Sequence, residues 1–122
     1  MNNTPKYSLF IYCIIFLIAV PLFATNIIKS FSGIALEDKV VLIWETANEQ
    51  QLDHFMVERS TDGDMFFMLG VIQCKNQAST YEFIDESVFA KPTSDATNDR
   101  VYIYRLKLVY NDGHSEYTDP IQ

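Results

Sequence analysis

The side chains that could act as nucleophiles, acid–base groups or metal ligands are few and lie far apart in this sequence. His54 and His114 are its two histidines, and neither has a cysteine at a spacing typical of zinc sites. Both fall at the edges of strand-like runs, where we expect them to be exposed. No glycine-rich phosphate loop occurs, and two histidines give no ground for a Ser-His-Asp arrangement. We therefore predict that the protein is not an enzyme.

Two pairs of carboxylates could attract a cation, Asp62 with Asp64 and Asp95 with Asp99. Calcium needs several oxygen ligands that converge on one point, and the ligand spacing of an EF-hand loop is absent. A carboxylate pair could also act as general acid and base, but that chemistry needs a cleft, which small domains rarely offer. We expect neither a metal ion nor a cofactor.

The two cysteines, Cys13 and Cys74, have different expected fates. Cys13 lies in an apolar N-terminal run and would leave with it on cleavage, so that Cys74 has no internal disulfide partner. A nucleophilic thiol needs positively charged surroundings, and the neighbouring Lys75 alone does not provide them. We expect Cys74 to be a small apolar filler.

The first 24 residues differ in composition from the remainder of the chain. Lys6 is their only charged residue, and residues 9–24, LFIYCIIFLIAVPLFA, carry no charge. This layout is typical of a secretory signal peptide and predicts cleavage after Ala24, which leaves a domain of residues 25–122. The apolar run is short for a membrane span of about 20 residues. An uncleaved membrane anchor is the alternative.

The chain carries a formal net charge of −7 at pH 7. An acidic protein repels phosphate backbones and anionic lipid surfaces, so nucleic acid is not an expected partner. A membrane would be a partner only through an uncleaved N-terminal segment. Export would place the protein in the periplasm, in the cell envelope or outside the cell.

Short runs of alternating apolar and polar residues follow the N-terminal segment. The run KVVLIWET, residues 39–46, is apolar on both faces and predicts a central strand. Asp62-Gly63 and Asp112-Gly113 are hairpin dipeptides, whose glycines allow a positive φ. Seven such strands without helical periodicity predict an all-β, antiparallel two-sheet sandwich. The predicted strands span residues 26–35, 39–46, 54–60, 65–73, 80–85, 100–110 and 114–120.

Three ordered blocks of residues resemble the fibronectin type III-like domain that is common in secreted proteins of Bacteroidetes-type bacteria. The blocks are WETANEQQLDHFMVERSTDGDMFFMLGVI at residues 44–72, YEFID at 81–85 and YRLKLVYNDGHSEYT at 104–118. The resemblance covers residues 37–119 and implies a seven-stranded immunoglobulin-like fold. Members often precede a C-terminal sorting domain for type IX secretion. We expect none after Gln122, so a periplasmic or envelope location stands beside secretion.

The shared residues imply structural rather than catalytic roles. Trp44 is expected between the sheets, and Tyr104 at the place of a tyrosine corner, its hydroxyl bonded to nearby backbone. Phe66 is predicted to point inward and Phe67 outward. The predicted core comprises Trp44, Phe55, Val57, Phe66, Phe83, Tyr104, Leu106 and Leu108.

Charged side chains near the first hairpin need partners. Arg59 shares a strand face with Phe55 and Val57, and a buried unpaired charge is costly. We predict that Glu49 or Asp85 accepts a hydrogen bond from Arg59 and so ties a loop to the sheet end. Glu58 and Lys107 are predicted to face outward on neighbouring strands and to form a pair.

These features predict a non-enzymatic, exported binding or spacer module that contacts a protein or glycan of the cell envelope. Contact would be through an exposed strand edge or through the long loop 86–100, with Lys91, Asp95 and Asp99 as candidates. A plain solvated insertion is the alternative for this loop. The alternative function is a carbohydrate-binding accessory module, which would need exposed aromatic side chains such as Phe67 and Tyr110.

Overall fold

The computed structural model describes residues 27–89 and 101–122. These residues form seven strands and one 3₁₀ turn, η1 (Ser87–Phe89). The predicted signal segment 1–24 lies outside the described residues, as do Lys91, Asp95 and Asp99 of the predicted contact loop. The strands are β1 (Ile28–Ala35), β2 (Val40–Thr46), β3 (Leu52–Ser60), β4 (Phe67–Gln73), β5 (Thr80–Asp85), β6 (Ile103–Tyr110) and β7 (Ser115–Tyr117).

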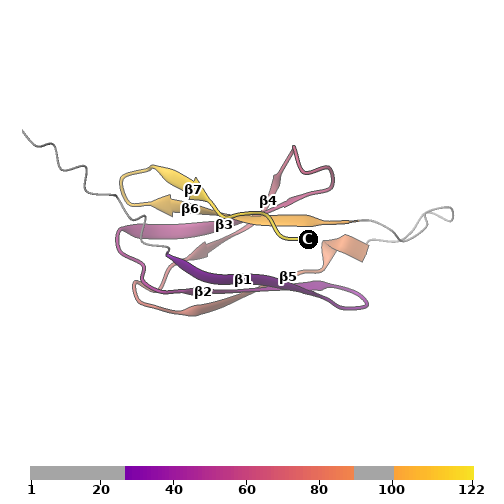
Figure 1. Ribbon diagram of the computed structural model, residues 1–122, viewed down its shortest axis with the longest axis horizontal. Helices are drawn as coiled ribbons and strands as arrows, with labels where there is room; N and C mark the ends of the chain where they lie inside the picture. Colours follow the sequence, from indigo (N-terminus) through magenta and orange to yellow (C-terminus); the bar gives the residue numbers. More distant parts are fainter. Residues whose placement is uncertain (1–26, 90–100) are drawn as a thin grey trace, which may run out of the picture.

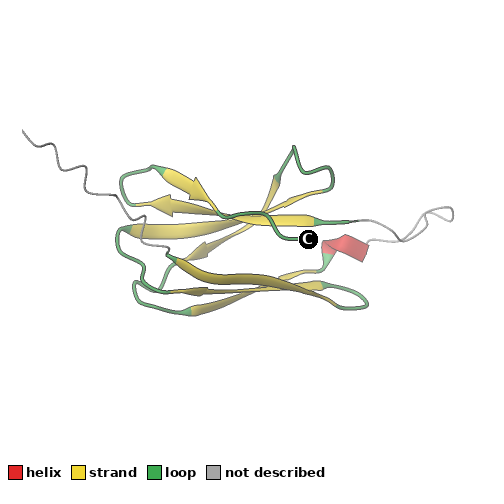
Figure 2. Cartoon of the chain, in the orientation of Figure 1, coloured by secondary structure: helices red, strands yellow, loops and turns green. Residues whose placement is uncertain are grey.

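The strands form two sheets that face each other, which confirms the predicted all-β two-sheet architecture (Figures 1 and 2). One sheet has three strands in the order β1-β2-β5, and the other has four in the order β4-β3-β6-β7. All neighbouring strands are antiparallel. β7 is shorter than the predicted strand 114–120, and β4 begins two residues later than predicted.

Alternation along the central strands places the core between the sheets. β2 buries Val40, Leu42 and Trp44 on one face, and β6 buries Tyr104, Leu106 and Leu108 in the same way. The Trp44 ring stacks on Tyr81 with 5.3 Å between ring centroids. Side chains with no exposed area are those of Leu42, Trp44, Phe55, Val57 and Leu106.

Phe83 packs against this core from β5 and lies under β4. A Cβ atom at Gly70 of β4 would be 2.7 Å from the Phe83 ring. Glycine at this position therefore lets two edge strands of opposite sheets approach each other closely. This contact closes one side of the sandwich.

The prediction that Phe66 points inward is wrong. A β-bulge lies between Val57 and Glu58, which pair with Gly70 and Met68 respectively, so that one extra residue is inserted into β4. Because the side-chain period of a strand is two, this insertion exchanges the faces of all residues before it. Phe66 consequently lies on the outer face of the four-stranded sheet, its ring centroid 3.8 Å from Cζ of Arg105.

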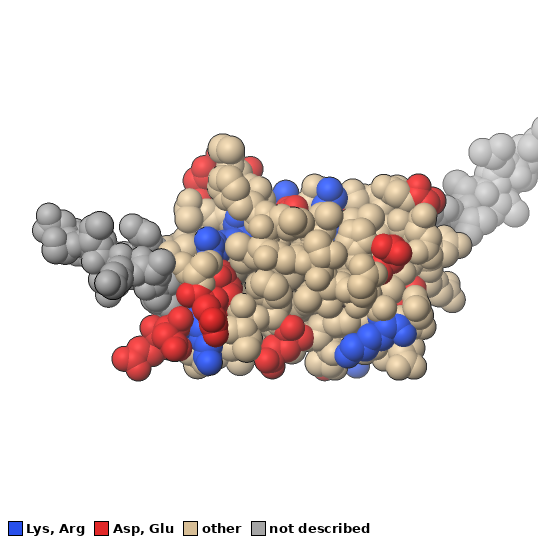
Figure 3. All heavy atoms as spheres, turned by 180° about the vertical axis from the view of Figure 1, so that it is seen from behind, with Lys and Arg blue, Asp and Glu red and all other residues tan. Residues whose placement is uncertain are grey.

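Tight turns join the strands at both ends of the molecule. Gly63 and Gly113 have φ values of 82° and 89°, the left-handed conformation that glycine adopts most readily. The β1–β2 turn, the β3–β4 hairpin and η1 lie at one end, here named the hairpin end (Figure 1). Acidic side chains gather there (Figure 3), and those at the turns of this end are Glu37, Asp38, Asp62, Asp64 and Glu86.

Candidate functional site

The first candidate is a polar cluster at the hairpin end, centred on Arg59. Its Nη1 atom donates hydrogen bonds to Oδ2 of Asp85 and to Oγ of Ser87, both at 2.7 Å. The Tyr104 hydroxyl donates to the same Oδ2 at 2.8 Å. Asp85 was one of the two predicted partners of Arg59, and the pair ties the end of β5 to β3. The predicted backbone partner of Tyr104 is wrong, because Asp85 takes its hydroxyl instead.

The electrostatics of this cluster fit a structural role. Burial alone would raise the pKa of Asp85, but hydrogen bonds from Ser87, Arg59 and Tyr104 outweigh it and hold the pKa below its usual value. Oδ1 of Asp85 accepts from the backbone N–H and the hydroxyl of Ser87. Burial and the bond to Asp85 raise the pKa of Tyr104 well above its usual value. Both carboxylate oxygens are occupied, so Asp85 is poorly placed to take a proton from a substrate.

A second polar cluster lies at the opposite end, around Glu49. Oε1 of Glu49 accepts hydrogen bonds from the hydroxyls of Thr46, at 3.0 Å, and Tyr81. Burial and Glu49 raise the pKa of Tyr81 to about 12. Oε2 of Glu49 and Nε1 of Trp44 are buried without a hydrogen-bond partner within residues 27–89 and 101–122. Glu49, the other predicted partner of Arg59, therefore holds the β2–β3 loop instead.

The thiol and the imidazoles are engaged in local contacts. Cys74 is half-buried, its Sγ donates to the carbonyl of Leu52 at 2.9 Å, and burial raises the pKa of its thiol. Nδ1 of His54 lies 2.6 Å from Oδ2 of Asp53, and the His114 ring stacks on the Tyr110 ring. Among the described residues, no three histidines, cysteines or carboxylates gather as metal ligands.

The outer face of the four-stranded sheet carries an ion pair with aromatic neighbours. Glu58 accepts from Nε of Arg105 at 2.7 Å, so the prediction of Lys107 as its partner is wrong. The cause is the register, which places Glu58 opposite Arg105 and Lys107 opposite Met56. Arg105 lies against Tyr117 as well, with 3.9 Å from its Cζ to the ring centroid.

The edge of β4 exposes several large apolar side chains. The strand reads FMLGVIQ and contains no charged residue, and in the described residues it pairs only with β3. The other edge strands differ, because β1 contains Lys29, β5 contains Glu82, and β7 has three residues. Exposed large apolar side chains on β4 and just before it are Met65 (64%), Phe67 (63%), Met68 (57%) and Val71 (45%).

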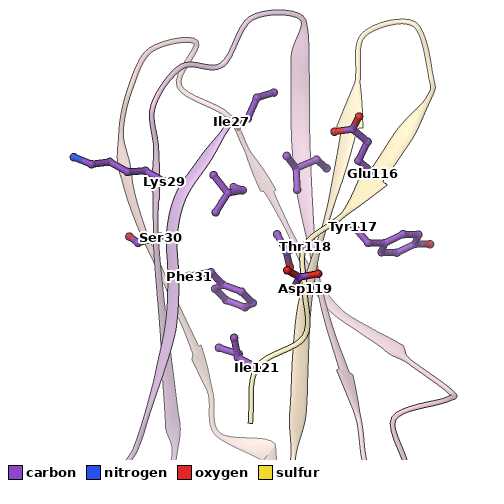
Figure 4. Close-up of a pocket in the computed structure, with 11 residues that line it drawn as sticks. Ile27, Lys29, Ser30, Phe31, Glu116, Tyr117, Thr118, Asp119 and Ile121 are labelled. Atoms are coloured by element: carbon purple, nitrogen blue, oxygen red, sulfur yellow. The ribbon is translucent and has the colours of Figure 1, made fainter. Parts of the chain in front are cut away.

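A cleft of about 490 Å³ opens between β1 and β7, on the side of the sandwich opposite β4 (Figure 4). Phe31 and Ile121 point into the space between the sheets, whereas Lys29 and Tyr117 point away from it. Lys29 is 3.9 Å from Glu45. Four further polar residues also line this cleft: Ser30, Glu116, Thr118 and Asp119.

The two aromatic residues considered for a carbohydrate platform lie far apart. Phe67 pairs with Arg59 and Tyr110 with Leu52, near opposite ends of β3. At about 3.3 Å per residue, the separation is roughly 23 Å. The Tyr110 ring is also covered by His114, with 4.1 Å between centroids. The two rings therefore cannot stack on neighbouring sugars.

Comparisons with known proteins identify no relative. A scan against protein-family models finds no match, and neither do searches of curated proteins and of solved structures. In the described part of the chain, no helix is both long and apolar enough to cross a membrane.

Proposed function

We propose that this protein is an exported, non-enzymatic contact module of the fibronectin type III-like type, which binds a protein of the cell envelope through the β4 edge. The observation that supports this is the lack of any charge or proline on β4. Soluble proteins protect edge strands with charges, prolines, β-bulges or short length, because an open edge pairs with other chains. β4 carries a bulge but has no charge and no proline over seven residues, whereas the other edge strands are charged or short.

The family assignment in this proposal rests on the resemblance of three sequence blocks. Its shared residues lie where a sandwich needs them: Trp44 has no exposed area, and Arg59 and Asp85 connect the two sheets. A spacer role needs nothing further, but a spacer does not account for four exposed apolar side chains at one edge. A contact role accounts for them.

Export rests on the uncharged run 9–24. N-terminal sequencing of the protein from its native cell tests this part of the proposal. A mature N-terminus near Thr25 is expected. An N-terminus at Met1 in a membrane fraction would instead favour the anchored form.

The contact surface is tested by site-specific photocrosslinking in the native cell. A photoreactive amino acid replaces Val71 on β4 in one variant and Ile34 on β1 in the other, which are 45% and 50% exposed. We expect a discrete protein adduct from position 71 and none from position 34. Adducts from position 34 alone, or from neither position, would contradict the proposal.

The loop 86–100 is the second candidate contact surface and needs a test of its own. Val88 is buried, and its carbonyl accepts a hydrogen bond from the Tyr102 hydroxyl at 2.8 Å. Residues 87–89 therefore belong to the folded domain and have to be kept. Replacing residues 91–99 by a short Gly/Ser link should leave the adduct at position 71 intact, and its loss would transfer the contact to the loop.

A further inference from the structure

We propose that the cleft between β1 and β7 binds a small organic cation, an ammonium group carried on an apolar body. This site goes beyond the function proposed above, because it lies on the side of the sandwich opposite β4. The cleft combines apolar walls with an inward-facing carboxylate, and each of these features selects one part of the ligand.

The apolar walls of the cleft come from both sheets. Phe31 lies on the inner face of β1, because it pairs with the buried Trp44 of β2. Leu108 of β6 and Ile121 contribute the opposite wall, and Figure 4 shows Phe31 and Ile121 pointing into the space between. Phe31 and Ile121 pack against the core but are only partly buried. An apolar ligand body would remove the remainder from water, which is favourable in proportion to the apolar area buried.

Glu116 places a carboxylate on the inner face of β7. It pairs with Leu108 of β6, whose side chain is buried between the sheets, so Glu116 faces the cleft as well. Figure 4 shows Glu116 on the cleft side of β7 and Tyr117 on the opposite side. The inner faces of a sandwich form its apolar core. A carboxylate in this position is therefore unusual, and it is the kind of polar group that orients a ligand in an apolar pocket.

Among the described residues, Glu116 has no positively charged partner. Asp85, also on an inner strand face, is paired with Arg59 at 2.7 Å, whereas none of the ion pairs in the described part of the chain includes Glu116. Its Oε2 atom accepts a hydrogen bond from the Tyr110 hydroxyl at 2.8 Å. Burial and Glu116 raise the pKa of Tyr110 to about 12, so this hydroxyl keeps its proton and remains the donor at neutral pH. Oε1 accepts no hydrogen bond from the described residues, which leaves it available to an ammonium.

The charges around the cleft favour a cation over an anion. Asp119 also lines the cleft and, within the described residues, is likewise in no ion pair. Lys29 is the basic residue of the described lining, but it points away from the cleft and lies 3.9 Å from Glu45. The chain carries a net charge of −7, so an anion would be repelled and a cation attracted.

The dimensions of the cleft suit a small molecule. Its volume of about 490 Å³ lies within the range of about 300–1,000 Å³ that is typical of ligand pockets. Glu116 pairs with Leu108 of β6. Ile121 forms a bridge with Tyr104, four residues earlier on that strand, which places it about 13 Å from Glu116 along the cleft. An ammonium beside Glu116, joined by a short chain to a ring beside Phe31 and Ile121, would extend along this length.

The test is an NMR titration of the full chain with phenylbutylamine, which is an ammonium at neutral pH. Two controls have nearly the same shape: phenylbutanol is neutral, and phenylbutyrate is an anion. We expect the cation to shift the amide signals of β1 and β7 but not those of β4. It should bind about fivefold more tightly than the alcohol, and the anion should bind more weakly than both. Equal affinities of cation and alcohol, shifts confined to other strands, or no saturable shifts would overturn the proposal.

Two matched variants identify the carboxylate that binds the cation. Glu116→Gln keeps the shape of the side chain and an acceptor for Tyr110 but removes the charge. It should lower the affinity for the cation about fivefold and leave the affinity for the alcohol unchanged. Glu82→Gln removes an exposed carboxylate from the outer face of β5 and should change neither affinity.

Circular dichroism should show the same fold for both variants. An affinity for the cation that is unchanged in Glu116→Gln, or equally reduced in Glu82→Gln, would overturn the proposal. The adduct expected at position 71 does not depend on this cleft, because β4 lies on the other side of the sandwich. Failure of the cation site would therefore leave the proposed function standing, and the reverse also holds.

Discussion

Arg59 illustrates what a single charged residue on an apolar strand face implies. A charge at such a position has to find a partner on another element, and Asp85 meets that need from the facing sheet, 2.7 Å away. The sequence predicts Glu49 or Asp85 as this partner, and the structure selects Asp85. The sequence does not reveal that the Tyr104 hydroxyl also donates a hydrogen bond to Oδ2 of Asp85. A hydroxyl can donate equally well to a backbone carbonyl or to a side-chain oxygen.

Arg59→Ala should lower the free energy of unfolding by about 3 kcal/mol, because it leaves the Asp85 carboxylate buried without its cation. Urea unfolding followed by circular dichroism measures this. Lys29→Ala is the matched control: its partner Glu45 is 3.9 Å away and both side chains are largely exposed, so the change should stay below about 1 kcal/mol. Equal losses in the two variants would contradict the structural role of Arg59.

Asp85 should also affect how the free energy of unfolding depends on pH in the acid range. Its pKa is lower in the folded protein than the value of 3.8 expected for an unfolded chain. Its contribution is therefore complete above pH 3.8 and is lost as the pH falls through the folded pKa, since the unfolded state binds the proton first. Below pH 4 the wild type should lose stability more steeply than Asp85→Asn. The exposed control Asp38→Asn should keep the wild-type slope in the same urea titrations.

At the scale of elements, alternation predicts strands well and registers poorly. Burial alternates along β2 and along β6 as far as Leu108, and the period of two correctly groups the residues that share the buried face. β4 contains a bulge, and one inserted residue leaves no trace in a run as uniformly apolar as MFFMLGVI. The face of Phe66 was therefore mispredicted. The partner of Glu58 was missed for a related reason, because register depends on loop geometry as well as on pattern.

The approach of β4 to β5 makes Gly70 sensitive to any side chain. Gly70→Ala should lower the free energy of unfolding by about 1–3 kcal/mol, because its Cβ would overlap the Phe83 ring. Phe83→Leu changes the shape of that contact, so Gly70→Ala should cost less in a Phe83→Leu background. A double-mutant cycle measured by urea unfolding gives the coupling. Additive losses would mean that Gly70 is sensitive for another reason.

At the scale of the molecule, two sheets with open edges depend on charge to remain apart from other copies. The chain carries a net charge of −7 at pH 7, and β4 has no charge of its own. Repulsion between whole molecules therefore helps to protect an edge that has no charge of its own. That protection is lost at the pH at which the net charge of the chain is zero.

Self-association should consequently rise near pH 4.6, the isoelectric point of the sequence. Light scattering between pH 7 and pH 4 measures it. Val71→Lys should reduce scattering near the isoelectric point more than Ile34→Lys, although both add the same charge to an exposed apolar position on an edge strand. Equal effects would indicate a general charge effect rather than pairing at β4.

Trp44 is the single tryptophan of the chain, stacked on Tyr81 in the centre between the sheets, and its Nε1 has no hydrogen-bond partner within the described residues. An indole in such surroundings emits at short wavelength. Its fluorescence therefore reports on one place only, the gap between the sheets. A red shift on unfolding would mark the moment at which water reaches that gap, so the protein carries its own optical probe of sheet separation.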